Sequence, residues 1–102
     1  MRLFLKKINL DDSSLSLSCY IGGLLRENRL KHGLSGHELA CNIKISQQQV
    51  SRYERGETSF QVEMLFRFFS ALRMTESEIQ YFFYRIINQA LITPRYTSSK
   101  FG

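Results

Sequence analysis

Hydrophobic residues recur every three or four positions through most of the chain, and its single proline, Pro94, comes near the end. This spacing predicts amphipathic helices, because hydrophobic residues in a half-buried strand alternate instead. Proline breaks a helix from within, so nearly everything before Pro94 is free to be helical. The pattern predicts five helices, over residues 18–32, 36–43, 47–54, 59–72 and 76–91.

The starts of these helices are marked by capping boxes. In a capping box a serine or threonine caps the first turn, and a glutamate or glutamine three residues later reaches back. Four pairs fit this pattern: Ser35 with Glu38, Ser46 with Gln49, Thr75 with Glu78 and, more weakly, Thr58 with Gln61. The stretch 31–33, Lys-His-Gly, is typical of a helix end. Gly22-Gly23 is a weak point of the first helix, and we interpret it as the junction with an N-terminal arm.

The second and third predicted helices are separated only by residues 44–46. Two short helices joined by so tight a turn form a helix-turn-helix, which is a DNA-binding element. At about 100° per residue, Val50 and Tyr53 share one side of the third helix. The other side carries four polar residues: Gln47, Gln48, Ser51 and Arg52. A recognition helix needs this division, since its polar side enters the major groove, where Gln pairs with adenine and Arg with guanine. An ordinary surface helix has the same division, so the neighbouring helix and turn favour recognition.

Composition agrees with a small nucleic-acid-binding domain. A chain of 102 residues, 43% of them hydrophobic, is long enough for one domain with one core. The net charge of +5 favours an anionic partner, with nucleic acid ahead of a membrane surface. No apolar run reaches the about 18 residues of a membrane helix, and the first residues are too polar for a signal peptide. We therefore expect a cytoplasmic protein that contacts no membrane.

Patterns for catalysis or metal binding do not occur in the sequence. We find no P-loop, no GxGxxG motif and no paired carboxylates. The two cysteines, Cys19 and Cys41, and the two histidines, His32 and His37, do not have zinc-ligand spacing. We expect no enzymatic activity, no metal, no cofactor and no small-molecule ligand. Both cysteines are expected to be reduced and buried, because nothing points to export.

Residues 34–56, from Leu34-Ser35-Gly36 to Glu54-Arg55-Gly56, resemble the Cro/C1-type (Xre) helix-turn-helix family, and the likeness extends over about residues 21–79. The resemblance implies an all-α, five-helix, lambda-repressor-like domain over residues 18–92, with the helix-turn-helix at about 36–54. Residues 1–17 would form an arm and residues 93–102 a tail. Within this region, residues 46–54 are similar to MrpJ-like regulators, which are encoded with fimbrial operons and repress flagellar genes.

The resemblance also implies roles for individual positions. Ala40 fills the small position where the two helices meet, and Arg29 and Glu54 fill positions of a partly buried ion pair. The positions that face base edges are Gln47, Gln48, Ser51 and Arg52. The positions in the loop that meets backbone phosphates are Arg55, Gly56 and Thr58. Phosphate contacts fix register and affinity, whereas base contacts fix sequence.

Two residues depart from the family pattern. Lys44 stands at a turn position usually held by glycine, which costs about 1 kcal/mol if the left-handed conformation is kept and places a cation near DNA as a phosphate contact. Gly36 stands where a phosphate-contacting glutamine is common. The sequence does not decide whether this phosphate contact is made, and His37 is a candidate to make it instead.

The last two predicted helices carry more apolar residues than one small bundle needs. A core stripe in the fourth helix consists of Met64, Leu65, Phe68, Phe69 and Leu72, with Phe66 outside it. One side of the fifth helix holds Ile79, Phe82, Phe83, Ile86, Ile87 and Ala90, extended by Tyr84 and Leu91. One interpretation is a roomy core covered by the arm residues Leu3, Phe4, Leu5 and Ile8. The other is a homodimer interface formed by Phe66, Tyr84 and Leu91, which suits a pseudo-palindromic operator on double-stranded DNA.

These observations predict a dimeric, sequence-specific transcriptional regulator, one that represses motility genes if the finer resemblance holds. One alternative is the antitoxin of a toxin–antitoxin pair, which shares the fold and regulates its own gene. Another is a protein-interaction module that uses the aromatic helices instead of DNA. Salt dependence separates this last class, because contacts to phosphates release counterions and make DNA binding steeply salt-sensitive.

Overall fold

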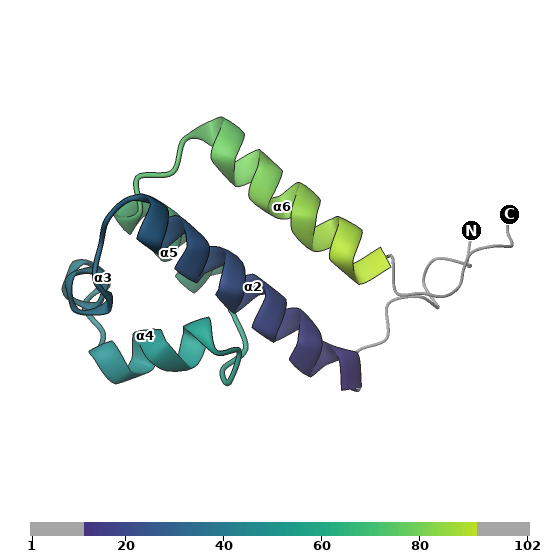
Figure 1. Ribbon diagram of the computed structural model, residues 1–102, viewed down its shortest axis with the longest axis horizontal. Coiled ribbons are helices and arrows are strands. Elements are labelled where there is room, and N and C mark those ends of the chain that lie inside the picture. Colours follow the sequence, from purple (N-terminus) through teal and green to yellow (C-terminus); the bar gives the residue numbers. More distant parts are fainter. Residues whose placement is uncertain (1–11, 92–102) are drawn as a thin grey trace, which may run out of the picture.

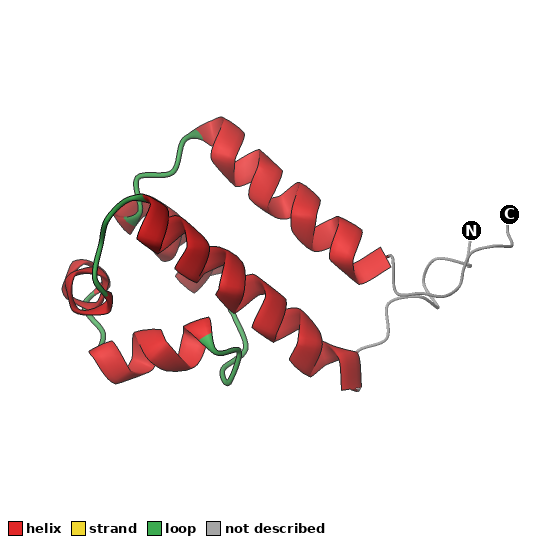
Figure 2. Ribbon diagram, viewed as in Figure 1, coloured by secondary structure: helices red, strands yellow, loops and turns green. Residues whose placement is uncertain are grey.

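The computed structural model describes residues 12–91, which form five helices joined by short loops and contain no strand (Figures 1 and 2). The helices are α2 (Asp12–Lys31), α3 (Gly36–Ile43), α4 (Gln47–Glu54), α5 (Val62–Ala71) and α6 (Glu76–Leu91). The predicted all-α architecture is therefore confirmed. The arm residues 1–11 and the tail residues 92–102 lie outside the described part of the chain.

Three helices have the predicted bounds, and two start elsewhere. The helix α2 begins at Asp12, not at residue 18, so the serine-rich stretch 13–18 is helical. The helix α5 begins at Val62, not at residue 59. The capping box predicted for Thr58 and Gln61 does not form, since Gln61 itself takes the N-cap position without a side-chain hydrogen bond.

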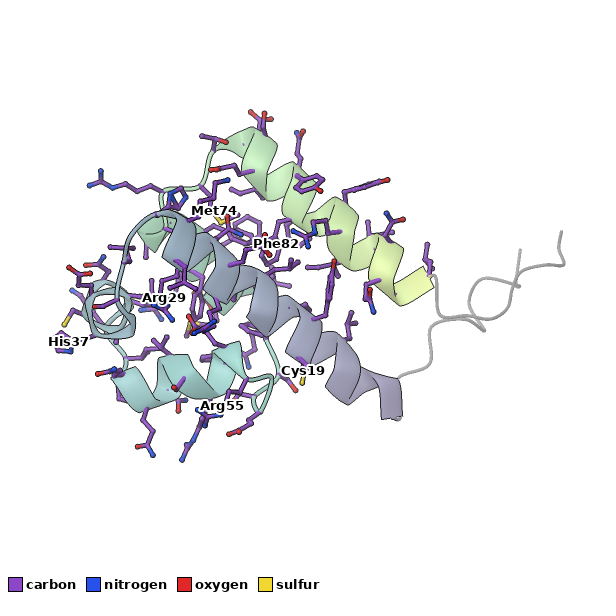
Figure 3. All side chains as sticks on the ribbon, in the orientation of Figure 1. Cys19, Arg29, His37, Arg55, Met74 and Phe82 are labelled. Carbon is purple, nitrogen blue, oxygen red and sulfur yellow. The ribbon has the colours of Figure 1, made fainter. Side chains whose placement is uncertain are left out.

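The core lies where α2, α3, α4 and α5 meet. Its fully buried side chains include Leu25, Leu39, Val50, Phe68, Phe69 and Leu72. The predicted stripe on α5 is buried except for Met64, which is half-buried. From α6 only Phe82 is buried among the described residues (Figure 3). The helix α6 is consequently an outer layer on a compact four-helix centre.

Each of the first four described helices is followed, within two residues of its end, by a residue in the left-handed conformation. Two of these residues are Gly33 and Gly56, with φ of 73° and 77°, and glycine is the residue that this conformation favours. The other two, Lys44 and Arg73, have φ of 66° and 56° although they carry side chains. Lys44 therefore does adopt the left-handed geometry in which it was predicted to replace glycine.

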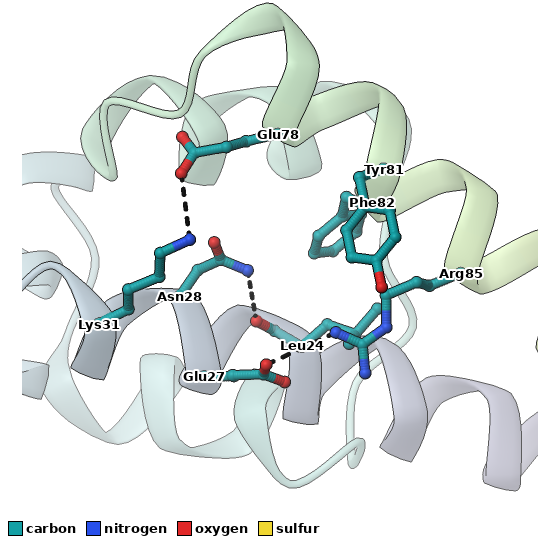
Figure 4. A pocket seen from close by; sticks show the side chains of 8 residues that line it. All are labelled: Leu24, Glu27, Asn28, Lys31, Glu78, Tyr81, Phe82 and Arg85. Atoms are coloured by element: carbon teal, nitrogen blue, oxygen red, sulfur yellow. Dashed lines mark hydrogen bonds and ion pairs between the residues drawn. The ribbon is translucent and has the colours of Figure 1, made fainter.

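The helices α2 and α6 lie side by side and enclose a shallow cleft of about 80 Å³ (Figure 4). Two ion pairs cross it, one from Lys31 to Glu78 at 3.3 Å and one from Arg85 to Glu27 at 3.5 Å. The Arg85 guanidinium also lies 5.7 Å from the ring centre of Tyr81. On this side, α6 is thus attached to α2 by polar groups that lie beside the buried Leu24 and Phe82.

The prediction that both cysteines are buried is wrong. Cys19 and Cys41 are free and exposed. Cys41 lies one turn after His37 on the outer side of α3, with its sulfur 3.7 Å from Nε2 of that histidine. The inner side of this short helix is occupied by Leu39, Ala40 and Ile43, so no core position is left for the thiol.

Candidate nucleic-acid interface

The turn between α3 and α4 is built from local hydrogen bonds. At the start of α3, Ser35 and Glu38 form the predicted capping box, with N–H to oxygen distances of 2.8 and 3.0 Å. At the end of α3, the Lys44 N–H donates to the carbonyl of Ala40. Ser46 then caps α4 by accepting a hydrogen bond from the Gln49 N–H at 3.0 Å. The Gln49 side chain does not complete the second box, so within the described residues this cap is one-sided.

The polar side of α4 faces outward, as the sequence predicted. Gln47, Gln48 and Arg52 are exposed, and Ser51 is half-buried. Val50 and Tyr53, on the opposite side, are buried. The four predicted base-contacting residues therefore share one accessible surface, which we call the α4 polar face (Gln47, Gln48, Ser51 and Arg52).

An aromatic cluster holds the inner side of α4. The Tyr53 ring lies 4.9 Å from the ring of Phe60 and 5.6 Å from that of Phe68, measured between centroids. On the other flank Gly22 of α2 approaches so closely that an added Cβ would overlap the carbonyl oxygens of Tyr53 and Glu54. The glycine pair lies within α2 and is not a junction with the arm. Gly22 is a site of close helix contact, whereas a Cβ at Gly23 would meet no atom within 4 Å.

The predicted ion pair between α2 and α4 is present. Arg29 donates to both carboxylate oxygens of Glu54, at 2.7 and 2.9 Å, and donates a third hydrogen bond to the Leu34 carbonyl at 2.9 Å. Both side chains are mostly buried, at 11% and 7% exposure. The hydrogen bonds that Arg29 donates to the Glu54 carboxylate raise the pKa of the Arg29 guanidinium above its ordinary value. The pair ties α2 and the loop before α3 to the end of α4.

The loop after α4 contains the predicted phosphate contacts, and they differ in accessibility. Arg55 is exposed and Thr58 is half-buried, while Gly56 is buried against Cys19 of α2. The Gly56 N–H already donates to the Tyr53 carbonyl at 3.0 Å. The structure thus gives Gly56 the role of ending α4 and packing on α2. Lys44 is exposed in the turn before α4.

Two further residues position this site and were not found from the sequence. Arg67 of α5 donates to the carbonyl of Ile43 at 3.0 Å and so caps the last turn of α3. Phe60, in the loop before α5, completes the aromatic cluster under Tyr53. Both contacts join residues from separate elements, so no local sequence motif predicts them.

The remaining predicted site residues lie away from α4. Phe66 and Tyr84 are exposed and Leu91 is half-buried. In the described part of the chain, no three His, Cys, Asp or Glu side chains lie close enough to hold a metal ion. Nor does any described helix have the length and apolarity needed to cross a membrane.

Comparisons with known proteins point to one family. A family model described as helix-turn-helix matches residues 25–79, which covers the end of α2, the whole of α3, α4 and α5, and the first turn of α6. Comparisons with curated proteins and with solved structures return no match.

Proposed function

The chain belongs to the Cro/C1-type helix-turn-helix family of DNA-binding transcriptional regulators, and we propose that it reads a specific operator with α4 in the major groove. The observation that carries the proposal is the α4 polar face. Its amide and guanidinium groups are accessible, while the opposite side of the helix is fixed by Val50 and Tyr53 in the core. A rigidly seated helix with exposed Gln and Arg side chains has the chemistry needed to distinguish adenine and guanine.

Contacts to the phosphates of the DNA backbone come from residues at the two ends of α4. Lys44 precedes the helix and Arg55 follows it, so the two cations bracket the α4 polar face. Thr58 adds a hydroxyl in the same loop. Such groups bind phosphates irrespective of sequence and fix the register in which the helix enters the groove. Because Gly56 is buried, we infer that it shapes the loop and does not itself contact a phosphate.

The test is a comparison of matched substitutions on a selected operator and on random duplex DNA. Gln48→Ala and Arg52→Ala should each cost about 1–3 kcal/mol on the operator and much less on random DNA. Gln49→Ala is the control, since it removes the same amide group from the next position, outside the α4 polar face. Equal losses on both DNAs, or an equal loss for the control, would contradict base reading.

The described structure leaves an apolar surface that supports a homodimer. On α5, Val62 and Phe66 are 70% and 47% exposed, and on α6, Tyr84 and Ile87 are 58% and 55% exposed. The ring of Phe66 lies 6.2 Å from that of Phe83, so the two helices form one continuous surface. We call this surface the α5–α6 apolar face: Val62, Phe66, Phe83, Tyr84, Ile87 and Leu91.

We propose that a second copy of the chain covers the α5–α6 apolar face, because a dimer recognises DNA more selectively than a monomer. One α4 reads only a few base pairs, which gives little selectivity in a genome. Two copies related by a two-fold axis double the sequence read, and place their recognition helices about 34–36 Å apart on successive turns of DNA. A contiguous exposed apolar surface is typical of such an interface. The polar attachment of α6 to α2, on its other side, leaves this face available.

We propose flagellar genes as the targets. The likeness of residues 46–54 to MrpJ-like regulators supports repression of flagellar genes, and the family match does not extend to that subfamily. Genome-wide mapping of bound sites, followed by footprinting of the best one, tests it. Enrichment of flagellar promoters is the expected result, and their absence from the bound set would remove motility from the proposal.

A further inference from the structure

A carboxylate is paired with one of the cations assigned to phosphate binding. The guanidinium of Arg55 binds both carboxylate oxygens of Glu57, from Nε at 2.8 Å and from the second terminal nitrogen at 3.1 Å. Both side chains are about half exposed, at 55% and 52%. Arg55 in the free protein therefore presents its planar donor edge to Glu57, and that same edge binds a phosphate bidentately.

The end of α4 holds Glu57 in this place. Gly56 is in the left-handed conformation. The Glu57 N–H donates a hydrogen bond to the Arg52 carbonyl at 2.9 Å, and the Gly56 N–H donates one to the Tyr53 carbonyl at 3.0 Å. These two bonds form a Schellman motif, which fixes the direction of the chain after the helix. The backbone of Glu57 is thereby anchored next to the last turn of α4 and beside Arg55.

The electrostatics agree with this arrangement. The hydrogen bonds from Arg55 lower the pKa of the Glu57 carboxyl, and the nearby charge of Arg52 lowers it further. Glu57 thus stands within the field of two cations, one on the α4 polar face and one beside it. A fixed negative charge at this place opposes the approach of the DNA backbone.

We propose that Glu57 limits the affinity for DNA by holding Arg55 in an intramolecular ion pair that must open before the guanidinium binds a phosphate. The inference rests on the proposed function of α4 and its flanking loop. Water screens an exposed pair and leaves it weak, so phosphates are able to displace Glu57, but each binding event bears the cost of opening the pair. The consequence is weaker attachment to DNA of any sequence, which helps a regulator leave non-specific sites.

The experiment compares Glu57→Gln with Glu76→Gln, which makes the same charge change at the start of α6. Affinity for random and operator duplexes is measured between about 50 and 200 mM salt. We expect Glu57→Gln to tighten binding to both DNAs about two- to fivefold. We expect the slope of log K against log salt to stay close to that of the wild type, because Arg55 contacts the same phosphate in both proteins once the pair has opened. An affinity equal to that of Glu76→Gln would overturn the proposal.

The double variant Arg55→Gln/Glu57→Gln separates release of Arg55 from simple loss of repulsion. If Glu57 acts by holding Arg55, adding Glu57→Gln to an Arg55→Gln background should change little. A gain that persists without Arg55 means that Glu57 only repels DNA, which overturns the proposed ion-pair mechanism. If neither the wild type nor any variant shows salt-dependent binding to duplex DNA, it is the proposed function that fails, and this inference fails with it.

Discussion

Arg29 shows how one residue makes a buried charge tolerable. Its guanidinium has three hydrogen bonds to protein oxygens, two to Glu54 and one to the Leu34 carbonyl. Arg26 adds a longer contact to Glu54 at 3.9 Å, from a side chain that is mostly exposed. Burying charges is costly unless both are paired and hydrogen-bonded, and here both conditions are met.

Arg29→Met should therefore destabilise the protein strongly. It leaves the buried Glu54 carboxylate with only the longer contact to the exposed Arg26, and it removes the hydrogen bond to the Leu34 carbonyl. We therefore expect a loss of about 3–5 kcal/mol in the free energy of unfolding. Urea denaturation measures this. The double variant Arg29→Met/Glu54→Met should recover much of the loss, because it leaves no unpaired charge. An unchanged midpoint for the single variant would show that the pair contributes nothing to stability.

Lys44 and Arg73 permit a matched test of strain at the residue scale. Each has a positive φ in a left-handed helix end that favours glycine. Lys44→Gly and Arg73→Gly should each raise the free energy of unfolding by about 0.5–1 kcal/mol, through relief of that strain less the entropy of glycine. Thermal unfolding of both variants checks this.

Only Lys44→Gly should also affect DNA binding. It removes a cation that we assign to a phosphate, so its log K should fall less steeply with log salt, by about 0.9. Arg73 lies in the loop between α5 and α6, and Arg73→Gly serves as the control. Loss of DNA affinity in both variants to the same extent would remove Lys44 from the interface.

At the scale of elements, the crossing of α2 and α4 depends on one glycine. A Cβ at Gly22 would overlap backbone oxygens of Tyr53 and Glu54, whereas a Cβ at Gly23 would meet no atom within 4 Å. Gly22→Ala should force α4 away from α2 and cost about 1–3 kcal/mol, as overpacking does. Gly23→Ala should instead stabilise α2 by about 0.5–1 kcal/mol, because alanine favours a helix interior.

Operator binding adds a second measurement to this pair. Displacement of α4 should weaken binding in Gly22→Ala, while Gly23→Ala should bind as the wild type does. Chemical denaturation and a binding titration on the same preparations provide both results. If Gly22→Ala were as stable as Gly23→Ala and bound equally well, the close helix approach would have no role in seating α4.

At the scale of the whole molecule, the arrangement of α6 determines the proposed dimer. Its two flanks differ, since Tyr81 adjoins the polar cleft with α2, while Tyr84 belongs to the α5–α6 apolar face. The two tyrosines are equally exposed and occur on one helix. Their rings stack on each other, with centroids 6.2 Å apart, so the pair tests whether the interface ends at Tyr84 or extends around the helix to Tyr81.

Tyr84→Glu should give a folded monomer with operator binding weakened at least tenfold, because a two-fold interface places each substitution twice in the contact. Tyr81→Glu should remain a dimer. Phe82→Glu, at a buried position, should unfold the domain. Sedimentation at micromolar concentration checks the states. A wild type that sediments as a 12.0 kDa species and binds its operator one to one would exclude the dimer, leaving the arm as the cover of this face.

The sequence by itself determined the features that depend on residues a few positions apart. The capping boxes at Ser35 and Thr75 and the stop at Gly33 involve hydrogen bonds within one turn of helix, so local residue types specify them. The spacing of apolar positions likewise specified which side of α4 is buried. Fold class and the α4 polar face follow from these two kinds of information.

Only the tertiary structure decided contacts between residues far apart in the chain. Arg67 caps α3 from α5, Gly22 admits α4, and Cys19 lies exposed beside Gly56 instead of buried. None of these contacts can be predicted from neighbouring residues in the sequence, because each depends on how closely two helices approach. The Arg55–Glu57 pair is close in sequence, yet it forms only because a left-handed turn at Gly56 directs the chain back. Helix propensity is a property of neighbouring residues, whereas contact between helices is a property of the packed molecule.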